Sequence, residues 1–277
     1  MFCESFANIK SKELQVKGKK LLISLVVVPV AIVAFIVVLI AVFAVDDVTV
    51  RYHDFDGREI VATQGEGVAP KDILKLIKGK STVLLSKTNL LEQLNKEHSD
   101  WHAFAVVKNF PNDIEVHFVK RTVIAKVNVN GLDVYVDSFG YVTELTSDNC
   151  VDISSAFPEG VEAQSSQPGS PLTFKDAKND VRFKCVLDAI MATWRCKVEV
   201  EYIPQVLGNE NVFEFVHDDM IIHMPKGSTI RVIAPETKLS DRLIEAYSVY
   251  YNKSENLQNG AEIVVHKSGK ITTKGNK

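Results

Sequence analysis

The chain has few of the residues that mark several large classes of protein. It holds 4 Cys, 9 Pro and 14 Gly in 277 residues, which excludes a disulfide-dense secreted scaffold, a collagen-like repeat and a Pro-rich disordered chain. Its 32 Lys and Arg are nearly balanced by 35 Asp and Glu, so it lacks the broad positive charge of a nucleic-acid-binding domain. No repeat of fixed period is present. A long uncharged apolar run, by contrast, occurs once, close to the start.

Residues 21–45 contain no charged side chain, and only Ser24 and Pro29 interrupt the apolar sequence. About 20 apolar residues in a helix cross a bilayer core, so this run predicts a transmembrane helix. The alternative is a cleaved signal peptide, because residues 41–44 (AVFA) resemble a cleavage site. The run is about twice as long as the apolar core of a signal peptide, which favours an uncleaved anchor.

The charges on either side of this run predict its orientation. Residues 1–20 carry five Lys and two Glu, whereas Asp46 and Asp47 follow the run directly. The positive-inside bias therefore predicts a cytoplasmic tail at 1–20 and an extracytoplasmic remainder. Residues 46–277 hold 27 basic and 33 acidic residues, a charge that does not suit a surface lying flat on anionic lipid.

Hydrophobic periodicity divides the remainder into two α+β parts. In the first part, Pro70 suits a helix start, Gly79 a helix stop and Thr88 the N-cap of a second helix. We expect a strand at 48–52, a loop or loosely paired hairpin at 54–67, helices at 69–78 and 88–98, and strands at 103–108 and 114–121 that flank a turn at 109–113.

The second part is a mixed β domain with helices on one face. Residues 146–172 are rich in Ser, Pro and Gly and predict an exposed loop. Around it we expect strands at 123–129, 133–136, 198–203, 212–216, 220–224, 229–233, 262–266 and 270–273, and helices at 174–194 and 236–251.

Short motifs for chemistry are incomplete, so we expect no enzyme activity, cofactor or metal. Lys78-Gly79-Lys80-Ser81 resembles the end of a phosphate-binding loop but has Leu74 where the first Gly is needed. His98 and His102 have a spacing that suits a metal only within a helix, and no HExxH motif is present. No Gly-x-Ser-x-Gly elbow occurs.

Three of the cysteines lie in the extracytoplasmic part. Cys185 and Cys196 stand 11 residues apart on or near one helix, which separates them by about 16 Å, too far for a disulfide. Cys150 can pair with either of them, or all three can be free.

The order and several local motifs resemble the FtsQ/DivIB family of bacterial cell-division proteins. Two motifs lie at the end of the first part: the strand, turn and strand around Phe110-Pro111-Asn112, and the segment Lys120-Arg121…Ala125 that leads out of it. Two more lie in the second part: Val136–Gly140, and Glu262–Val265 before Ser268-Gly269. The chain departs from the family at Lys120 and Val123, where the family usually has Glu and Pro. The resemblance implies a cytoplasmic tail (1–20), a transmembrane helix (21–45), a POTRA-like β-α-α-β-β domain (46–122), an FtsQ/DivIB-type β domain (123–273) and a tail (274–277).

By this resemblance the chain is a non-enzymatic, single-pass scaffold of the divisome in the bacterial inner membrane, at the septum. Its partners would be FtsB-type and FtsL-type membrane proteins, held by strand addition at the C-terminal edge strand and by a nearby helix. The POTRA-like module would serve recruitment to the division site. The implied contact residues are Tyr247, Tyr250, Tyr251, His266, Ser268, Gly269, Lys270, Ile271 and Thr272. The alternative for the tyrosines is that they only cover the sheet.

Two other classes of protein remain as alternatives. POTRA modules also occur in export or assembly chaperones, which usually carry several modules and a barrel. A membrane-anchored exported enzyme is the less favoured class, because it requires a pocket of convergent polar groups for which the sequence offers no motif.

Overall fold

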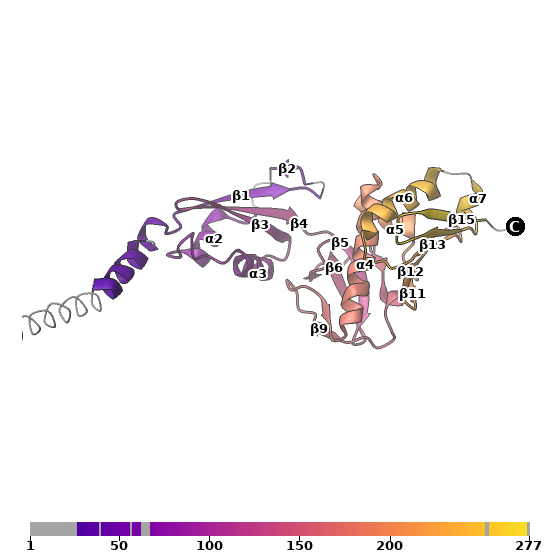
Figure 1. The fold of residues 1–277 in the computed structure, drawn as a ribbon, viewed down its shortest axis with the longest axis horizontal. Coiled ribbons are helices and arrows are strands. Elements are labelled where there is room, and N and C mark those ends of the chain that lie inside the picture. The colour runs from indigo at the N-terminus through magenta and orange to yellow at the C-terminus, as the bar shows by residue number, and fades with distance from the viewer. Residues whose placement is uncertain (1–26, 39, 56, 62–66, 253–254, 276–277) are drawn as a thin grey trace, which may run out of the picture. The chain divides into compact units, whose positions relative to one another are not determined.

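A computed structural model describes residues 27–275 except 39, 56, 62–66 and 253–254, and it is an α+β protein (Figure 1). Its chain contacts divide it into two compact units. The first comprises residues 1–53, 58–91 and 104–118, and the second comprises 54–57, 92–103 and 119–277. The expected tail at 1–20, part of the expected anchor at 21–45, and residues 276 and 277 of the expected tail at 274–277 lie outside the described residues. Lys274, which we expected in that tail, is instead the last residue of the final strand.

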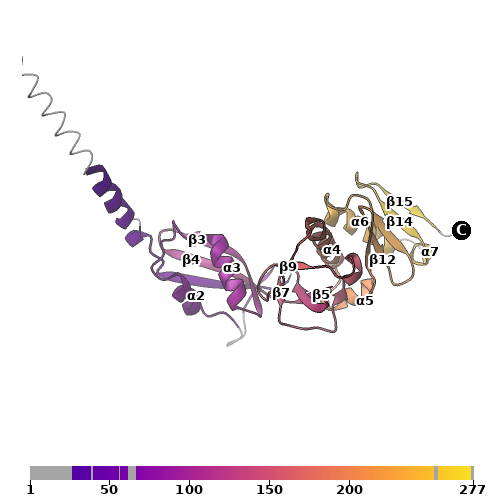
Figure 2. The same ribbon diagram turned by 90° about the horizontal axis from the view of Figure 1, so that it is seen from below.

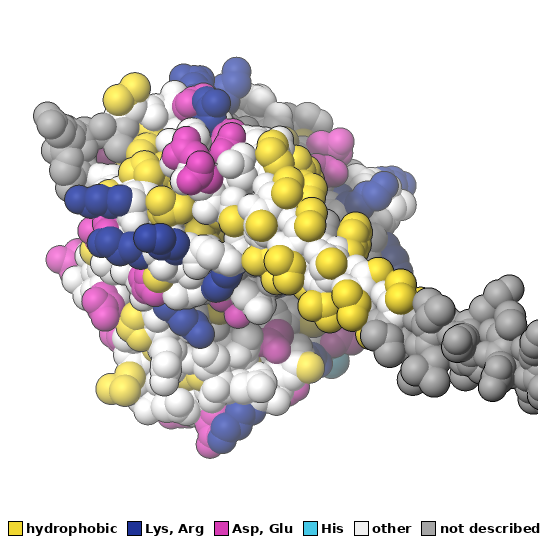
Figure 3. All heavy atoms as spheres, turned by 90° about the vertical axis from the view of Figure 1, so that its left-hand side faces the viewer, with side chains coloured by type: hydrophobic (Ala, Val, Ile, Leu, Met, Phe, Trp, Pro, Cys, Tyr) yellow, Lys and Arg dark blue, Asp and Glu magenta, His cyan; other side chains and the backbone are white. Residues whose placement is uncertain are grey.

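Residues 27–38 and 40–42 of the first unit are helical, and their valine, isoleucine and phenylalanine side chains are exposed. Figure 3 shows these hydrophobic side chains gathered along the helix. Among the residues described here, no helix combines the length and the apolar composition needed to cross a membrane. Residues 21–26 and 39 of the apolar run lie outside that description.

The first sheet has the order β2-β1-β4-β3, built from β1 (Asp47–His53), β2 (Glu59–Ile60), β3 (Trp101–Asn109) and β4 (Asp113–Lys120). Between β2 and β3 come α2 (Pro70–Ile77) and α3 (Lys87–Glu97) (Figure 1). The predicted order of a strand, two helices and two strands is therefore present, with the two-residue strand β2 added where we expected a loop or loosely paired hairpin. The buried side chains Ile73 and Ile77 of α2 and Ile114, Val116 and Phe118 of β4 form its core.

The second unit contains two larger sheets and two long helices. One sheet has the order β7-β6-β5-β8, and the other has the order β11-β12-β13-β14-β15. Helix α4 (Ala177–Arg195) packs against α6 (Leu239–Asn252), and α6 also packs on β14 (Figure 2). The bounds of the strands are β5 Val123–Val129, β6 Leu132–Asp137, β7 Val142–Thr143, β8 Val151–Asp152, β11 Phe213–Val216, β12 Asp219–His223, β13 Thr229–Val232, β14 Glu262–Val265 and β15 Ile271–Lys274.

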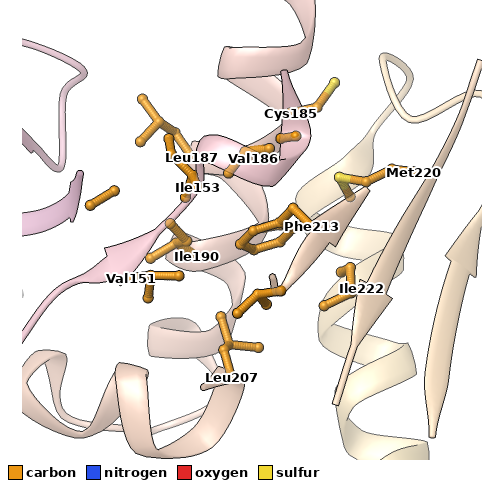
Figure 4. Close-up of a cluster of buried hydrophobic side chains, with 14 of the residues drawn as sticks. Val151, Ile153, Cys185, Val186, Leu187, Ile190, Leu207, Phe213, Met220 and Ile222 are labelled. Carbon is orange, nitrogen blue, oxygen red and sulfur yellow. The ribbon is translucent and has the colours of Figure 1, made fainter. Parts of the chain in front are cut away.

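One hydrophobic core joins these two sheets. In Figure 4, Val151 from the sheet β7-β6-β5-β8, Ile190 from α4, and Phe213 and Ile222 from the five-stranded sheet point toward one another. All four are almost completely buried. Because both sheets contribute to a single core, the second unit folds as one body.

The expected exposed loop at 146–172 is the largest error of the sequence analysis. It contains β8, the 3-10 turn η1 (Ser154–Ala156) and β9 (Ala163–Ser165), which pairs with β10 (Thr173–Phe174). Cys150 is buried, and the other apolar side chains belong to the hydrophobic core: Val151, Ile153, Ala156, Phe157, Val161 and Leu172. They are spaced too irregularly to show a period of 2 or 3.6, so the pattern did not reveal them.

Several element boundaries also differ from the prediction. The expected strand at 198–203 is wrong, because η2 (Val200–Tyr202) leads there into the short helix α5 (Ile203–Leu207), with Pro204 in its first turn. Asp176 accepts a hydrogen bond from the Lys178 amide, so α4 begins three residues later than expected.

Helix α3 begins one residue before Thr88, because Ser86 Oγ accepts from the Asn89 amide at 3.3 Å. Helix α6 likewise begins at Leu239 rather than at 236. A short helix that the sequence analysis did not predict, α7 (Glu255–Gln258), follows it.

Candidate functional site: the C-terminal sheet edge

The strand β15 is the last strand of the five-stranded sheet, and among the residues that the structure describes it pairs only with β14. A turn at 266–270 joins them, in which the His266 amide donates to the Lys270 carbonyl and the Gly269 amide donates to the His266 carbonyl, both at 2.9 Å. Gly269 has φ +87°, which any residue with a side chain adopts at a cost. The glycine therefore allows the tight reversal that returns the chain along β14.

The pairing register determines which backbone groups face away from β14. His266 pairs with Lys270, Val264 with Thr272, and Glu262 with Lys274. In an antiparallel ladder, hydrogen-bonded pairs alternate with pairs whose amides and carbonyls point outward. By this alternation the backbone groups of Ile271 and Thr273 point away from the sheet. They are positioned to pair with a further strand.

Polar contacts across the β14–β15 hairpin hold several of its side chains in place. His266 Nε2 lies 3.1 Å from Thr272 Oγ1, and Lys274 Nζ donates to a carboxylate oxygen of Glu262 at 3.3 Å. Ile271 packs against the core. The structure therefore brings together the expected contact residues of the hairpin, from His266 to Thr272, on one strand and its turn.

The three tyrosines of α6 occupy different environments. Tyr247 is completely buried, and its hydroxyl donates to the Ala189 carbonyl at 3.4 Å. Tyr250 is 3% exposed, whereas Tyr251 is 39% exposed, and their rings meet edge to face at 5.0 Å. Burial raises the pKa of Tyr247 and Tyr251. Tyr247 and Tyr250 thus belong to the buried core, and Tyr251 is the most exposed of the three.

Arg242, which the sequence analysis did not single out, supports the start of the hairpin. Only 5% of it is exposed, and its Nη1 donates to the carbonyls of Ile233 at 2.9 Å and His266 at 3.2 Å. Its Nη2 donates to the Ala234 carbonyl at 2.8 Å. An arginine one residue before Leu243, on the apolar face of a predicted helix, was the available signal.

A second polar cluster lies deep in the second unit. Arg121 Nη1 donates to Asp137 Oδ2 at 3.3 Å, its Nε donates to the Trp101 carbonyl at 3.2 Å, and its Nη2 donates to the Asn95 carbonyl at 2.8 Å. Arg121 is 4% exposed and Asp137 is completely buried. This ion pair joins two motifs of the family resemblance, Lys120-Arg121 and Val136–Gly140.

The other oxygen of Asp137 shapes the turn after β6. Oδ1 accepts from the amides of Phe139 and Tyr141, each at 2.9 Å. Burial raises the pKa of Asp137, although these amides and Arg121 oppose that change. His102 stacks on the Phe139 ring at 4.1 Å, and burial followed by the charge of Arg121 lowers its pKa to about 3. The imidazole is therefore neutral at physiological pH.

In the described part of the chain, the potential metal ligands and the three cysteines do not form a common site. Within the described residues, no group of three or more His, Cys, Asp or Glu side chains is placed to hold a metal ion. Cys150, Cys185 and Cys196 are free thiols, and burial raises the pKa of Cys150 to about 11.

Comparison with known proteins gives no family model that matches this chain and no curated protein that matches it.

Proposed function

We propose that this protein is a single-pass, non-enzymatic scaffold of the bacterial division machinery, of the FtsQ/DivIB type, at the septum of the inner membrane. Residues 21–45 anchor it, and the POTRA-like and FtsQ/DivIB-type domains lie outside the cytoplasm. It holds FtsB-type and FtsL-type membrane proteins by adding a strand of the partner to β15.

The observation that carries this proposal is the outward-facing backbone of β15. An extended segment can pair with the amides and carbonyls of Ile271 and Thr273, and neighbouring side chains supply selectivity. The buried Arg242 holds the His266 carbonyl, so this edge is already ordered before a partner binds. Tyr251, the most exposed of the three α6 tyrosines, is of a residue type that is frequent at binding hot spots.

The sharpest test uses the substitution Thr273→Pro. Proline removes an outward amide and places its ring where the added strand would lie, but it leaves the ladder with β14 in place. We expect this variant to lose co-purification with FtsB-type and FtsL-type proteins from growing bacteria. Its circular dichroism and melting temperature should stay close to those of the parent protein.

Thr273→Val is the matched control, since it changes the same side chain and keeps the backbone amide. This variant should bind its partners as the parent does. Equal partner recovery with Thr273→Pro and with the parent protein would refute strand addition at β15.

A further inference from the structure

The apolar run enters the first unit without a linker. Its last residues, Phe43 to Val45, already belong to the fold. The Phe43 carbonyl accepts from the Thr82 amide at 2.6 Å, and the Val45 amide donates to the Lys80 carbonyl at 3.0 Å. Ala44 forms an antiparallel bridge with Ser81, and Val45 is only 6% exposed.

The turn between β3 and β4 also contacts the end of the apolar run, in addition to the turn at residues 80–82. The Asp46 amide donates to the Asn112 carbonyl at 3.0 Å, in the turn between β3 and β4. Thr82 Oγ1 donates to the Pro111 carbonyl at 2.6 Å, which ties the two turns together. The Phe110 ring lies edge to face against Phe43, with 6.2 Å between the ring centres.

The turn that begins at Lys80 and the turn between β3 and β4 both carry large exposed apolar side chains. Leu84 is 67% exposed, Phe110 is 63% exposed and Val83 is 42% exposed. Each lies within two residues of a group that contacts residues 43–46, which corresponds to about 8 Å along the chain. The patch formed by Val83, Leu84 and Phe110 therefore lies close to the end of the apolar run.

Charge does not explain this patch. Lys78, Lys80, Lys87 and Lys108 near it are balanced in number by Asp46, Asp47, Asp113 and Glu115. Since the local charges cancel, attraction to anionic lipid is not the driving force, and apolar contact is what the surface offers.

We propose that Val83, Leu84 and Phe110 insert into the lipid interface, so that the first unit sits directly on the bilayer around its own anchor. This inference rests on the proposed membrane anchor at 21–45. The polar layer of a bilayer is about 5–8 Å thick on each side, a depth that side chains so near the end of the run reach. The occupant is lipid, because the residues that lead to the patch are the last residues of the run itself.

The test places a photoreactive side chain on the full-length protein in phosphatidylcholine nanodiscs. Four single variants carry p-benzoylphenylalanine in place of Leu84, Phe110, Phe35 or Ile60. Phe35 lies in the apolar run, and Ile60 is an exposed side chain of β2 opposite Tyr52, about 20 Å along β1 from the patch. After irradiation, mass spectrometry measures the lipid adduct at each position.

We expect lipid adducts at Leu84 and Phe110 several-fold above the level at Ile60, and the strongest adduct at Phe35. Adducts at Leu84 and Phe110 no stronger than at Ile60, with a clear adduct at Phe35, would overturn this inference and leave the anchor in place. No adduct at Phe35 would overturn the anchor itself and with it the proposed function. In native bacterial membranes, cross-links from Leu84 and Phe110 to a protein in place of lipid would also overturn the inference, since a partner would then cover the patch.

Discussion

At the scale of single residues, Arg121 and Asp137 form a buried ion pair within the second unit. Both charges are withdrawn from water, which is costly unless each keeps its partner. Arg121 meets Asp137 and two backbone carbonyls, and Asp137 meets two backbone amides as well. The polar groups of this cluster therefore depend on one another.

The substitution Arg121→Leu should lower the free energy of unfolding by about 3–5 kcal/mol, because it leaves the Asp137 carboxylate buried without its counter-charge. Chemical denaturation in detergent measures the loss. Arg231→Leu is the matched control, since Arg231 pairs with Asp219 at a partly exposed site, and it should cost no more than about 1 kcal/mol. Similar losses for the two variants would contradict the cooperative cluster.

His102 makes stability depend on pH. Its pKa falls from 6.5 in the unfolded chain to about 3 in the fold, so the unfolded chain binds more protons between these values. The free energy of unfolding should therefore fall as the pH drops below 6.5, by about 2 kcal/mol between pH 7 and pH 5. Denaturation curves at both pH values measure the change.

His102→Phe should lose most of this pH dependence, because phenylalanine has no proton to bind. His223→Gln, a change at an exposed side chain, should retain it. A His102→Phe variant with the same pH dependence as the parent would show that another group is responsible.

At the scale of elements, the segment 146–172 makes close contacts with α3 that its Ser-, Pro- and Gly-rich composition does not predict. Gly169 has φ +77°, and a Cβ on it would lie 2.5 Å from the Asn95 carbonyl oxygen and 2.7 Å from Lys96 Cα. Both atoms belong to the backbone of α3, which cannot move aside like a flexible side chain. Glycine is thus required there by space as well as by conformation.

Gly169→Ala should therefore destabilise the protein more than Gly160→Ala. Gly160 has φ +73° and open space around its Cα, so alanine there costs only the conformational penalty of about 1–2 kcal/mol. At Gly169 overpacking adds about 1–3 kcal/mol. Thermal unfolding of the two variants compares them directly, and equal losses would mean that the approach to α3 is looser than the structure has it.

At the scale of the whole molecule, the chain consists of two units with separate cores. In the proposed function they have separate tasks: the resemblance assigns recruitment to the POTRA-like module and partner capture to the C-terminal edge. Damage to one task should then leave the other intact.

A fluorescent fusion at the N-terminus, which the proposed function places in the cytoplasm, should gather at mid-cell in dividing bacteria. The Thr273→Pro variant should still gather there, while labelled FtsB-type protein no longer joins it. Fluorescence microscopy of both proteins in the same cells gives the result. Loss of mid-cell signal from the variant would show that partner capture and recruitment are one task.

Much of the fold could be predicted from local sequence. The first β-α-α-β-β order, the hairpin from 262 to 274 and the apolar run all follow from periodicity and from turn residues such as Gly79 and Gly269. These signals are local, because a strand or helix shows its buried face within one short window. The expected contact residues from His266 to Thr272 were likewise found together because they are neighbours in sequence.

The sequence by itself determined where most of the elements outside 146–172 lie, which end of the chain carries the apolar run and which turns reverse the chain. Only the tertiary structure decided that 146–172 lies in the core, that Tyr247 is buried, and that Arg121 meets Asp137. These outcomes depend on contacts between residues far apart in the chain, and no local period encodes such contacts. Burial and ion pairing are properties of the packed whole, so they appear only when the distant segments have come together.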